Sequence, residues 1–286
     1  MPSRCVTLVL TKSRNDASIS RRHSLWAGGH TATTHRTTSP SRRFSNEPVR
    51  NLVSADDEAY RNLMARRIRG DATAAAVMVA GSATFLAGAF MPVSRVYVER
   101  DPQRKLAILL ADPGQWSAQQ MLLAAGTAAL PVGVVMLARQ WDTGSGRGSQ
   151  EPLAGQRLAQ GAALAWVAGA GLFLGHLEAR YRDPEAFALG NMPFWPFQGY
   201  MGLSLAGMAA LGGGLLARAR AHTNSGALPQ DPRWPGWLNV GGAGVFAGVL
   251  MATGDLPPLL VYVVELTTGA TLLRQLRRSA DPGKPA

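Results

Sequence analysis

The chain has 286 residues, of which 47% are hydrophobic and only 16% are charged, and its formal net charge is +11. In an ordinary soluble domain about a quarter of the residues are charged, so this composition excludes that class. The single cysteine, Cys5, excludes an internal disulfide and any cluster of cysteine metal ligands.

Residues 1–70 form a basic segment rich in serine and arginine, with 13 of the 29 lysines and arginines and no long apolar run. Three interpretations stay open. The segment fits a disordered cytoplasmic tail of low hydrophobicity. It also fits an organellar presequence, although the acids at 56–58 weaken this. Finally, translation that starts at Met64 would leave residues 1–63 out of the mature protein.

Six apolar stretches follow the basic segment. A helix needs about 20 mostly apolar residues to cross the hydrocarbon core of a bilayer. The stretches cover residues 73–93, 118–138, 158–177, 197–217, 237–253 and 257–273. They predict an all-α, polytopic helical membrane bundle over residues 71–278, followed by a short polar C-terminal tail at 279–286.

The last two stretches are the weakest part of this prediction. Only three residues separate them, and Pro257 and Pro258 could begin a full span or the return limb of a re-entrant hairpin. Six spans is our prediction, and five spans plus an irregular segment is the alternative.

The connectors contain a repeated Asp-Pro pair. An aspartate that caps a helix, followed by proline at the first helical position, is a common way to begin a helix. Asp101-Pro102 therefore predicts a short helix that ends near Ala111 and lies on the outer surface. The same pair recurs at Asp183, Asp231 and Asp281, where we expect a structural role as well.

The distribution of positive charge predicts the orientation. Six spans place both termini on one side, and 23 of the 29 lysines and arginines fall on that side. Excess positive charge marks the cytoplasmic face, so both termini should be cytoplasmic. We expect a bacterial plasma membrane, with a mitochondrial or plastid inner membrane as the alternative. This asymmetry accounts for the net charge without a nucleic-acid partner.

Glu265 is the one acidic residue deep in an apolar stretch. At 1.5 Å per residue it lies about 12 Å from Pro257, near the middle of the membrane. Its helical face carries Tyr262, Thr268 and Gly269, which are smaller or more polar than the opposite face. Glu265 should therefore point into the bundle, and an ionisable group there is a candidate proton-handling or ligand-binding site, with Tyr262 and Thr268 beside it.

Glu265 also has a purely structural interpretation. Burial favours the neutral form of a carboxyl group, and a neutral acid could simply hydrogen-bond to a neighbouring helix. The candidate polar partners are Thr127, Gln198, Ser204 and Asn239.

No cofactor or metal site is indicated. Beyond the basic segment the only histidines are His176 and His222, and the predicted topology places them on opposite faces, which argues against a haem between two histidines. His176 and Glu178 alone are too few ligands for a metal, since such sites need three or four.

Two glycine pairs have the small-xxx-small spacing that lets membrane helices approach closely. They are Gly171 with Gly175, and Gly244 with Gly248. They favour a compact bundle and give a weak indication of self-association.

These features support two main functional hypotheses. The first is a non-enzymatic membrane subunit, scaffold or accessory protein, in contact with lipid and either self-associated or bound to partner membrane subunits. The alternative is a small carrier or receptor in which Glu265 handles protons, cations or a small ligand, with Asp255 near the outer mouth. A membrane enzyme that uses His176, Glu178 and Asp183 at the outer face ranks third, because no catalytic motif is present.

The predicted orientation can be tested with a reporter fused after Ala286. We expect a cytoplasmic readout, because six crossings return the C-terminus to the side of the basic segment. An external readout would show that the last two apolar stretches make only one crossing.

Overall fold

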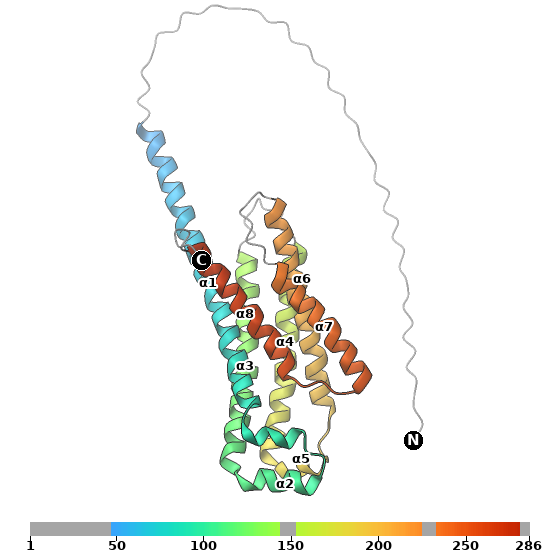
Figure 1. Ribbon diagram of the computed structural model, residues 1–286. Coiled ribbons are helices and arrows are strands. Elements are labelled where there is room, and N and C mark those ends of the chain that lie inside the picture. The colour runs from blue at the N-terminus through green and yellow to red at the C-terminus, as the bar shows by residue number, and fades with distance from the viewer. Residues whose placement is uncertain (1–46, 144–152, 225–232, 281–286) are drawn as a thin grey trace, which may run out of the picture. The chain divides into compact units, whose positions relative to one another are not determined.

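The fold was analysed in a computed structural model, which describes residues 47–143, 153–224 and 233–280. Within these ranges the chain is helical and contains no strand. From Val49 onward the helices form one compact unit; of the unit before it, Met1–Pro48, the structure describes only Glu47 and Pro48. Figure 1 shows the long helices side by side and two short helices across one end.

The described elements follow one another along the chain with short connections. They are α1 (Glu47–Ala89), the 3-10 helix η1 (Pro92–Tyr97), α2 (Pro102–Ala111), α3 (Pro113–Thr143), α4 (Leu153–Arg182), α5 (Pro184–Ala188), α6 (Trp195–Asn224), α7 (Arg233–Thr253) and α8 (Leu259–Ala280).

The six predicted spans are confirmed by helices long and apolar enough to cross a membrane. Their apolar parts are Ile68–Ala89, Pro113–Trp141, Ala154–Arg182, Trp195–Arg220, Arg233–Thr253 and Leu259–Arg277. The last two are separate helices of 21 and 22 residues, joined through Gly254 with a positive φ of 72°. The protein is therefore a multi-pass membrane protein.

The first helix starts earlier than the sequence analysis placed it. α1 begins at Glu47, so residues 47–70, which we assigned to the tail, are helical and continuous with the first span. Pro48 occupies the first turn, and no proline or glycine interrupts residues 49–69, which explains why the helix extends through this polar stretch. Residues 1–46 lie outside the described part, and so do Asp231 and Asp281.

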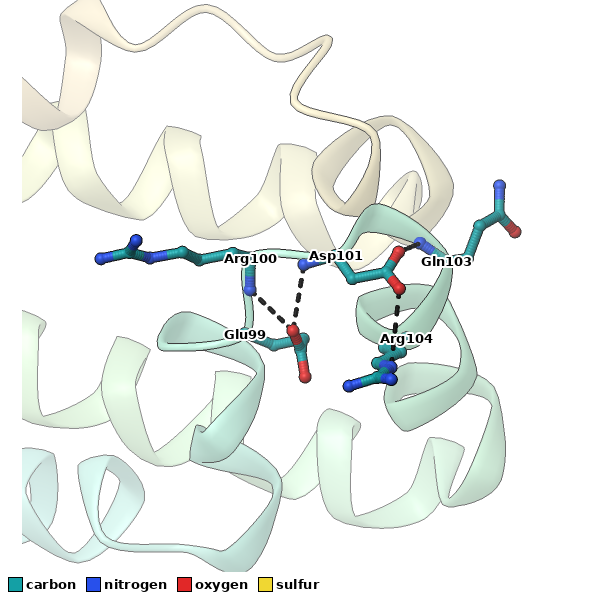
Figure 2. Close-up of polar contacts among 5 residues, drawn as sticks. All are labelled: Glu99, Arg100, Asp101, Gln103 and Arg104. Carbon is teal, nitrogen blue, oxygen red and sulfur yellow. Dashed lines mark hydrogen bonds and ion pairs between the residues drawn. The ribbon is translucent and has the colours of Figure 1, made fainter.

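Asp101 and Asp183, the two predicted Asp-Pro caps that lie within the described residues, do cap helices. The Asp101 carboxylate accepts a hydrogen bond from the Gln103 backbone N–H at 2.9 Å and pairs with Arg104 at 3.5 Å (Figure 2). The Asp183 carboxylate accepts from the Ala186 N–H at 2.8 Å. Just before α2, the backbone N–H groups of Asp101 and Arg100 donate to Glu99 and lower the pKa of its carboxyl.

The short elements η1, α2 and α5 pack together at one end of the bundle, which we call the capped end. A small apolar cluster joins them to α3 there, made of Val93, Val96, Leu109, Trp116 and Ala188. α1 and α4 finish at the capped end, while α3 and α6 begin there.

Close packing of α1 on α3 depends on glycines that were not singled out in the sequence. A Cβ added at Gly126 would lie 2.5 Å from the Phe85 backbone nitrogen and 2.7 Å from the Gly81 carbonyl oxygen. A Cβ at Gly133 would lie 2.9 Å from the Ala74 carbonyl oxygen. Because these neighbours are backbone atoms, a larger residue would push the two helices apart.

The other spans are joined by a similar glycine contact and by one ion pair. A Cβ at Gly212 of α6 would lie 2.6 Å from the Gly236 carbonyl oxygen of α7. At the end opposite the capped end, Arg218 pairs with Asp71 at 3.5 Å and covers the Trp141 ring at 5.1 Å. This pair links α6 to α1, with α3 beneath it.

The α1–α3 contact predicts unequal effects of two glycine substitutions. Gly126→Ala should lower the thermal midpoint by several degrees, because overpacking costs about 1–3 kcal/mol. Gly175→Ala is the control, since a Cβ there meets nothing within 4 Å. It should leave the midpoint unchanged or raise it, because alanine favours helix. Equal midpoints for both variants in a detergent thermal-shift assay would contradict the described contact.

Candidate functional site

The candidate site lies on the polar face of α8, inside the bundle. Glu265, Tyr262 and Thr268 are all 0% exposed, as expected from their shared helical face. Within the described part of the chain, neither carboxyl oxygen of Glu265 has a hydrogen-bond partner. A buried carboxyl group with both oxygens unpaired is costly, and therefore uncommon unless it serves a function.

Tyr262 connects α8 to three other helices. Its ring stacks on Phe85 of α1, with centroids 3.6 Å apart and planes at 7°. Its hydroxyl accepts a hydrogen bond from the Tyr200 hydroxyl of α6 at 3.0 Å and donates to the Thr127 hydroxyl of α3 at 3.1 Å. Phe173 of α4 stacks in turn on Tyr200 at 4.4 Å. The position of Tyr262 is therefore fixed by contacts that reach four helices.

Thr268 connects α8 to α7. Its hydroxyl accepts a hydrogen bond from the side-chain amide of Asn239 at 2.6 Å, and the same amide donates to the Pro235 carbonyl at 3.0 Å. The amide oxygen of Asn239 is buried and has no partner among the described residues. Neighbouring helices thus supply hydrogen-bond partners to Tyr262 and to Thr268, which lie about one turn before and one turn after Glu265.

The register between α1 and α8 places Ser82 at the level of Glu265. Phe85 contacts Tyr262. Seven residues back along α1, Met78 faces Gly269, where an added Cβ would meet the Met78 Cβ at 3.3 Å. Ser82 shares this face of α1 and lies between the two contacts, as Glu265 does on α8. Its hydroxyl is fully buried and unpartnered in the described structure.

Two further groups reach the same level from α6 and α3. Ser204 follows Tyr200 by one turn, as Glu265 follows Tyr262, and it is fully buried. Pro131 lies inside α3 and has no N–H to donate, so the Thr127 carbonyl lacks its usual helical donor. Pro131 therefore leaves a backbone acceptor on α3, at the residue whose side chain bonds to Tyr262.

The polar groups at the candidate site offer oxygen atoms as ligands. The contacts of Tyr262, Thr268 and Gly269 place four further oxygen groups near the level of Glu265. They are the Asn239 amide oxygen, the Thr127 carbonyl and the hydroxyls of Ser82 and Ser204. Oxygen ligands of this kind favour a proton or a hard cation. Among the residues that the structure describes, no group of three or more His, Cys, Asp and Glu side chains could hold a metal ion.

Other residues named from the sequence lie elsewhere. Of the four candidate partners, Thr127, Ser204 and Asn239 are buried near α8, whereas Gln198 is exposed. Asp255 is also exposed, in the α7–α8 connector. His176 is buried at the capped end, while Glu178 pairs with Arg182 at 2.5 Å on the surface.

The predicted glycine pairs do not take part in close contacts within the chain. A Cβ at Gly171, Gly175, Gly244 or Gly248 would meet nothing within 4 Å. If these glycines pack against a helix, that helix therefore belongs to another molecule.

Sequence reasoning missed Ser82 and Tyr200. Ser82 carried a detectable signal, since it is the polar residue on the α1 face that also holds Met78 and Phe85. Tyr200 followed by Ser204 is another polar pair at helical spacing. Hydroxyl residues are common in membrane helices, however, and only the contacts between helices show that Ser82 lies at the level of Glu265 and Tyr200 at the level of Tyr262.

Comparisons with protein-family models, with curated proteins and with solved structures give no match for this chain. The function therefore has to be argued from the site itself.

The buried site predicts that Glu265→Gln folds and inserts normally. Glutamine keeps the shape of the neutral acid, so the thermal midpoint should stay within about 3 °C of wild type, or roughly 1 kcal/mol. Glu178→Gln, at a surface ion pair, is the control. Poor membrane insertion of the Glu265→Gln variant alone would indicate that Glu265 is charged and paired in the folded protein.

Proposed function

We propose that this protein is a small membrane carrier in which Glu265 binds a proton and a hard or organic cation alternately. The observation that carries the proposal is a fully buried carboxyl group whose two oxygens have no hydrogen-bond partner among the described residues. A carboxyl group with a purely structural role would be expected to form hydrogen bonds with its neighbours.

The neighbouring hydroxyls support proton exchange at this position. Tyr200 and Tyr262 hydrogen-bond in series to Thr127, so each hydroxyl is held by another member of the set. The Glu265 carboxyl is left with oxygens that can carry a proton or accept a cation. The Thr127 carbonyl next to Pro131 adds a backbone ligand, and carriers commonly use helix irregularities in this way.

The same proposal includes the orientation. The capped end would face outward and the Asp71–Arg218 end the cytoplasm, consistent with the excess of positive charge on the side of the termini. A bacterial plasma membrane is the setting we propose.

Cation-driven proton release tests the proposal directly. The purified protein in weakly buffered detergent is titrated with sodium, potassium or an organic ammonium chloride while the pH is recorded. Because the cation and the proton compete for Glu265, wild type should release up to about one proton per chain, and the apparent cation affinity should rise with pH. Glu265→Gln should release none, and Glu178→Gln should match wild type.

Two outcomes would contradict the carrier. One is an absence of proton release from wild type with every cation; the other is equal release from wild type and Glu265→Gln. If release is seen, proteoliposomes with an enclosed pH indicator then show whether the exchange crosses the membrane.

A membrane subunit or scaffold is the second candidate, and α7 is the observation that favours it. Only 17% of the most apolar part of α7 is buried, compared with 56% for α6, and Gly244 and Gly248 lie on its open side. Native mass spectrometry separates the candidates: an oligomer or complex of protein alone favours the subunit, and a retained small cation lost with Glu265→Gln favours the carrier.

A further inference from the structure

Arg180, near the end of α4, is the most enclosed arginine at the capped end. The residue is only 8% exposed. The guanidinium lies over the rings of Phe187 of α5 at 4.7 Å, Tyr97 of η1 at 5.6 Å and Phe197 of α6 at 6.0 Å. Figure 1 shows α2 and α5 crossing this end of the bundle. The cation is thus held among aromatic rings from three elements.

This guanidinium has no carboxylate partner in the described structure. Its neighbours in sequence and space are already engaged: Glu178 pairs with Arg182, and the Asp183 carboxylate caps α5. The Nε atom of Arg180 is buried and has no acceptor. Cation–π contacts offset part of the cost of burying a charge, but they do not supply that N–H with an acceptor.

The Tyr97 hydroxyl shows how close this charge lies. The Tyr97 residue is 38% exposed, but its hydroxyl end turns inward and accepts a hydrogen bond from the Gln120 amide at 3.2 Å. Burial raises the pKa of that hydroxyl, and the positive charge of Arg180 acts in the opposite direction. The positive charge of Arg180 therefore affects a group inside the capped end.

Further donors surround the same aromatic ring. Trp116 stacks on Phe187 with centroids 5.6 Å apart, and its indole N–H is buried without an acceptor. The Lys105 ammonium lies 5.7 Å from the centre of the Phe187 ring. Arg180, Lys105 and Trp116 thus contact one side chain, and the described structure gives the N–H of Trp116 and the Nε–H of Arg180 no acceptor.

We propose that the capped end contains a binding site for a phosphate group, centred on Arg180 with Lys105 and Trp116 as additional donors. A planar guanidinium, an ammonium and an indole N–H that all lie around the Phe187 ring can together bind the several oxygens of a phosphate. The position at the end of α4 is the depth at which phospholipid headgroups lie. The phosphate could belong to an anionic lipid or to a free phosphate ester. This site is separate from the one around Glu265 and does not depend on the proposed carrier function.

Binding requires the Phe187 ring to give way, because it covers the guanidinium. α5 has only five residues, is followed by Gly190 with a positive φ of 73°, and leaves Phe187 partly buried. A short helix between an aspartate cap and a glycine turn can shift without disturbing the spans.

Binding is tested on the full-length protein in detergent, with four probes. Two are lipids with identical acyl chains, phosphatidylglycerol and phosphatidylcholine; the others are glycerol 3-phosphate and inorganic phosphate. Native mass spectrometry measures lipid retention, and the rise in thermal midpoint with probe concentration measures affinity for each probe. We expect wild type to bind phosphatidylglycerol at least about tenfold more tightly than phosphatidylcholine.

Three variants locate the site. Arg180→Gln should weaken binding of the anionic probe about tenfold or more. Lys105→Gln, at a partly exposed position, should weaken it several-fold. Arg182→Gln removes the same charge from an exposed arginine of the same helix and should leave binding within twofold of wild type. If Arg180→Gln does not fold, two other results test the proposal. They are the preference of wild type for phosphatidylglycerol over phosphatidylcholine, and weaker binding by Lys105→Gln than by Arg182→Gln.

The outcomes are distinct. Binding of phosphatidylglycerol alone supports the site and assigns it to a lipid headgroup. Binding of glycerol 3-phosphate or inorganic phosphate as well supports it and assigns it to a free phosphate. The proposal is overturned if wild type binds none of the anionic probes, or if Arg182→Gln weakens binding as much as the Arg180 or Lys105 variants do.

Discussion

Enclosure of the polar face of α8 is the constraint on which the bundle depends. A helix that carries a carboxyl group cannot present that face to lipid without a large cost, so protein has to surround it. α1, α3 and α6 meet around Tyr262, and α7 is joined one turn beyond Glu265 through Asn239. The last described helix, α8, therefore determines where the earlier ones converge.

Small residues make this convergence possible. Lipid chains are as apolar as leucine, so membrane helices gain little from apolar burial and depend on close packing and interhelical hydrogen bonds. Gly126 and Gly133 allow α1 and α3 to approach, and Gly212 does the same for α6 and α7. Large aromatic side chains then fill the space at the centre, with Trp166 and Phe173 from α4.

Local patterns in the sequence predicted the helices more accurately than they predicted the contacts between those helices. Hydropathy alone gives the six spans, and the Asp-Pro pairs give the starts of α2 and α5, because both signals lie within a few neighbouring residues. The inward direction of Glu265 also followed from the polarity of its own helical face. α1 was placed too short, since a polar helix outside the membrane has no apolar run to reveal it.

What the sequence left undecided concerns pairs of residues far apart in the chain. Thr127 and Tyr262 are separated by 135 positions, and nothing local to either indicates their hydrogen bond. Arg180 carries no local signal of its enclosure, since an arginine at the end of a span usually reaches toward the headgroups. Tryptophans near the ends of spans also differ in a way that hydropathy does not show, since Trp116 and Trp141 pack inside the protein while Trp195, Trp234 and Trp237 are exposed.

The uneven burial of α7 has a mechanical consequence. Its buried residues, Pro235, Gly236, Asn239 and Ala243, all lie in the first half, where Gly212 and Thr268 hold it. The second half has no fully buried residue and ends at the glycine turn before α8. The first half of α7 is therefore held more tightly than the second, whose Phe246, Ala247 and Leu250 pack against the core while only partly buried. Bending of the second half should cost less than displacement of the first, so local opening of α7 should begin there.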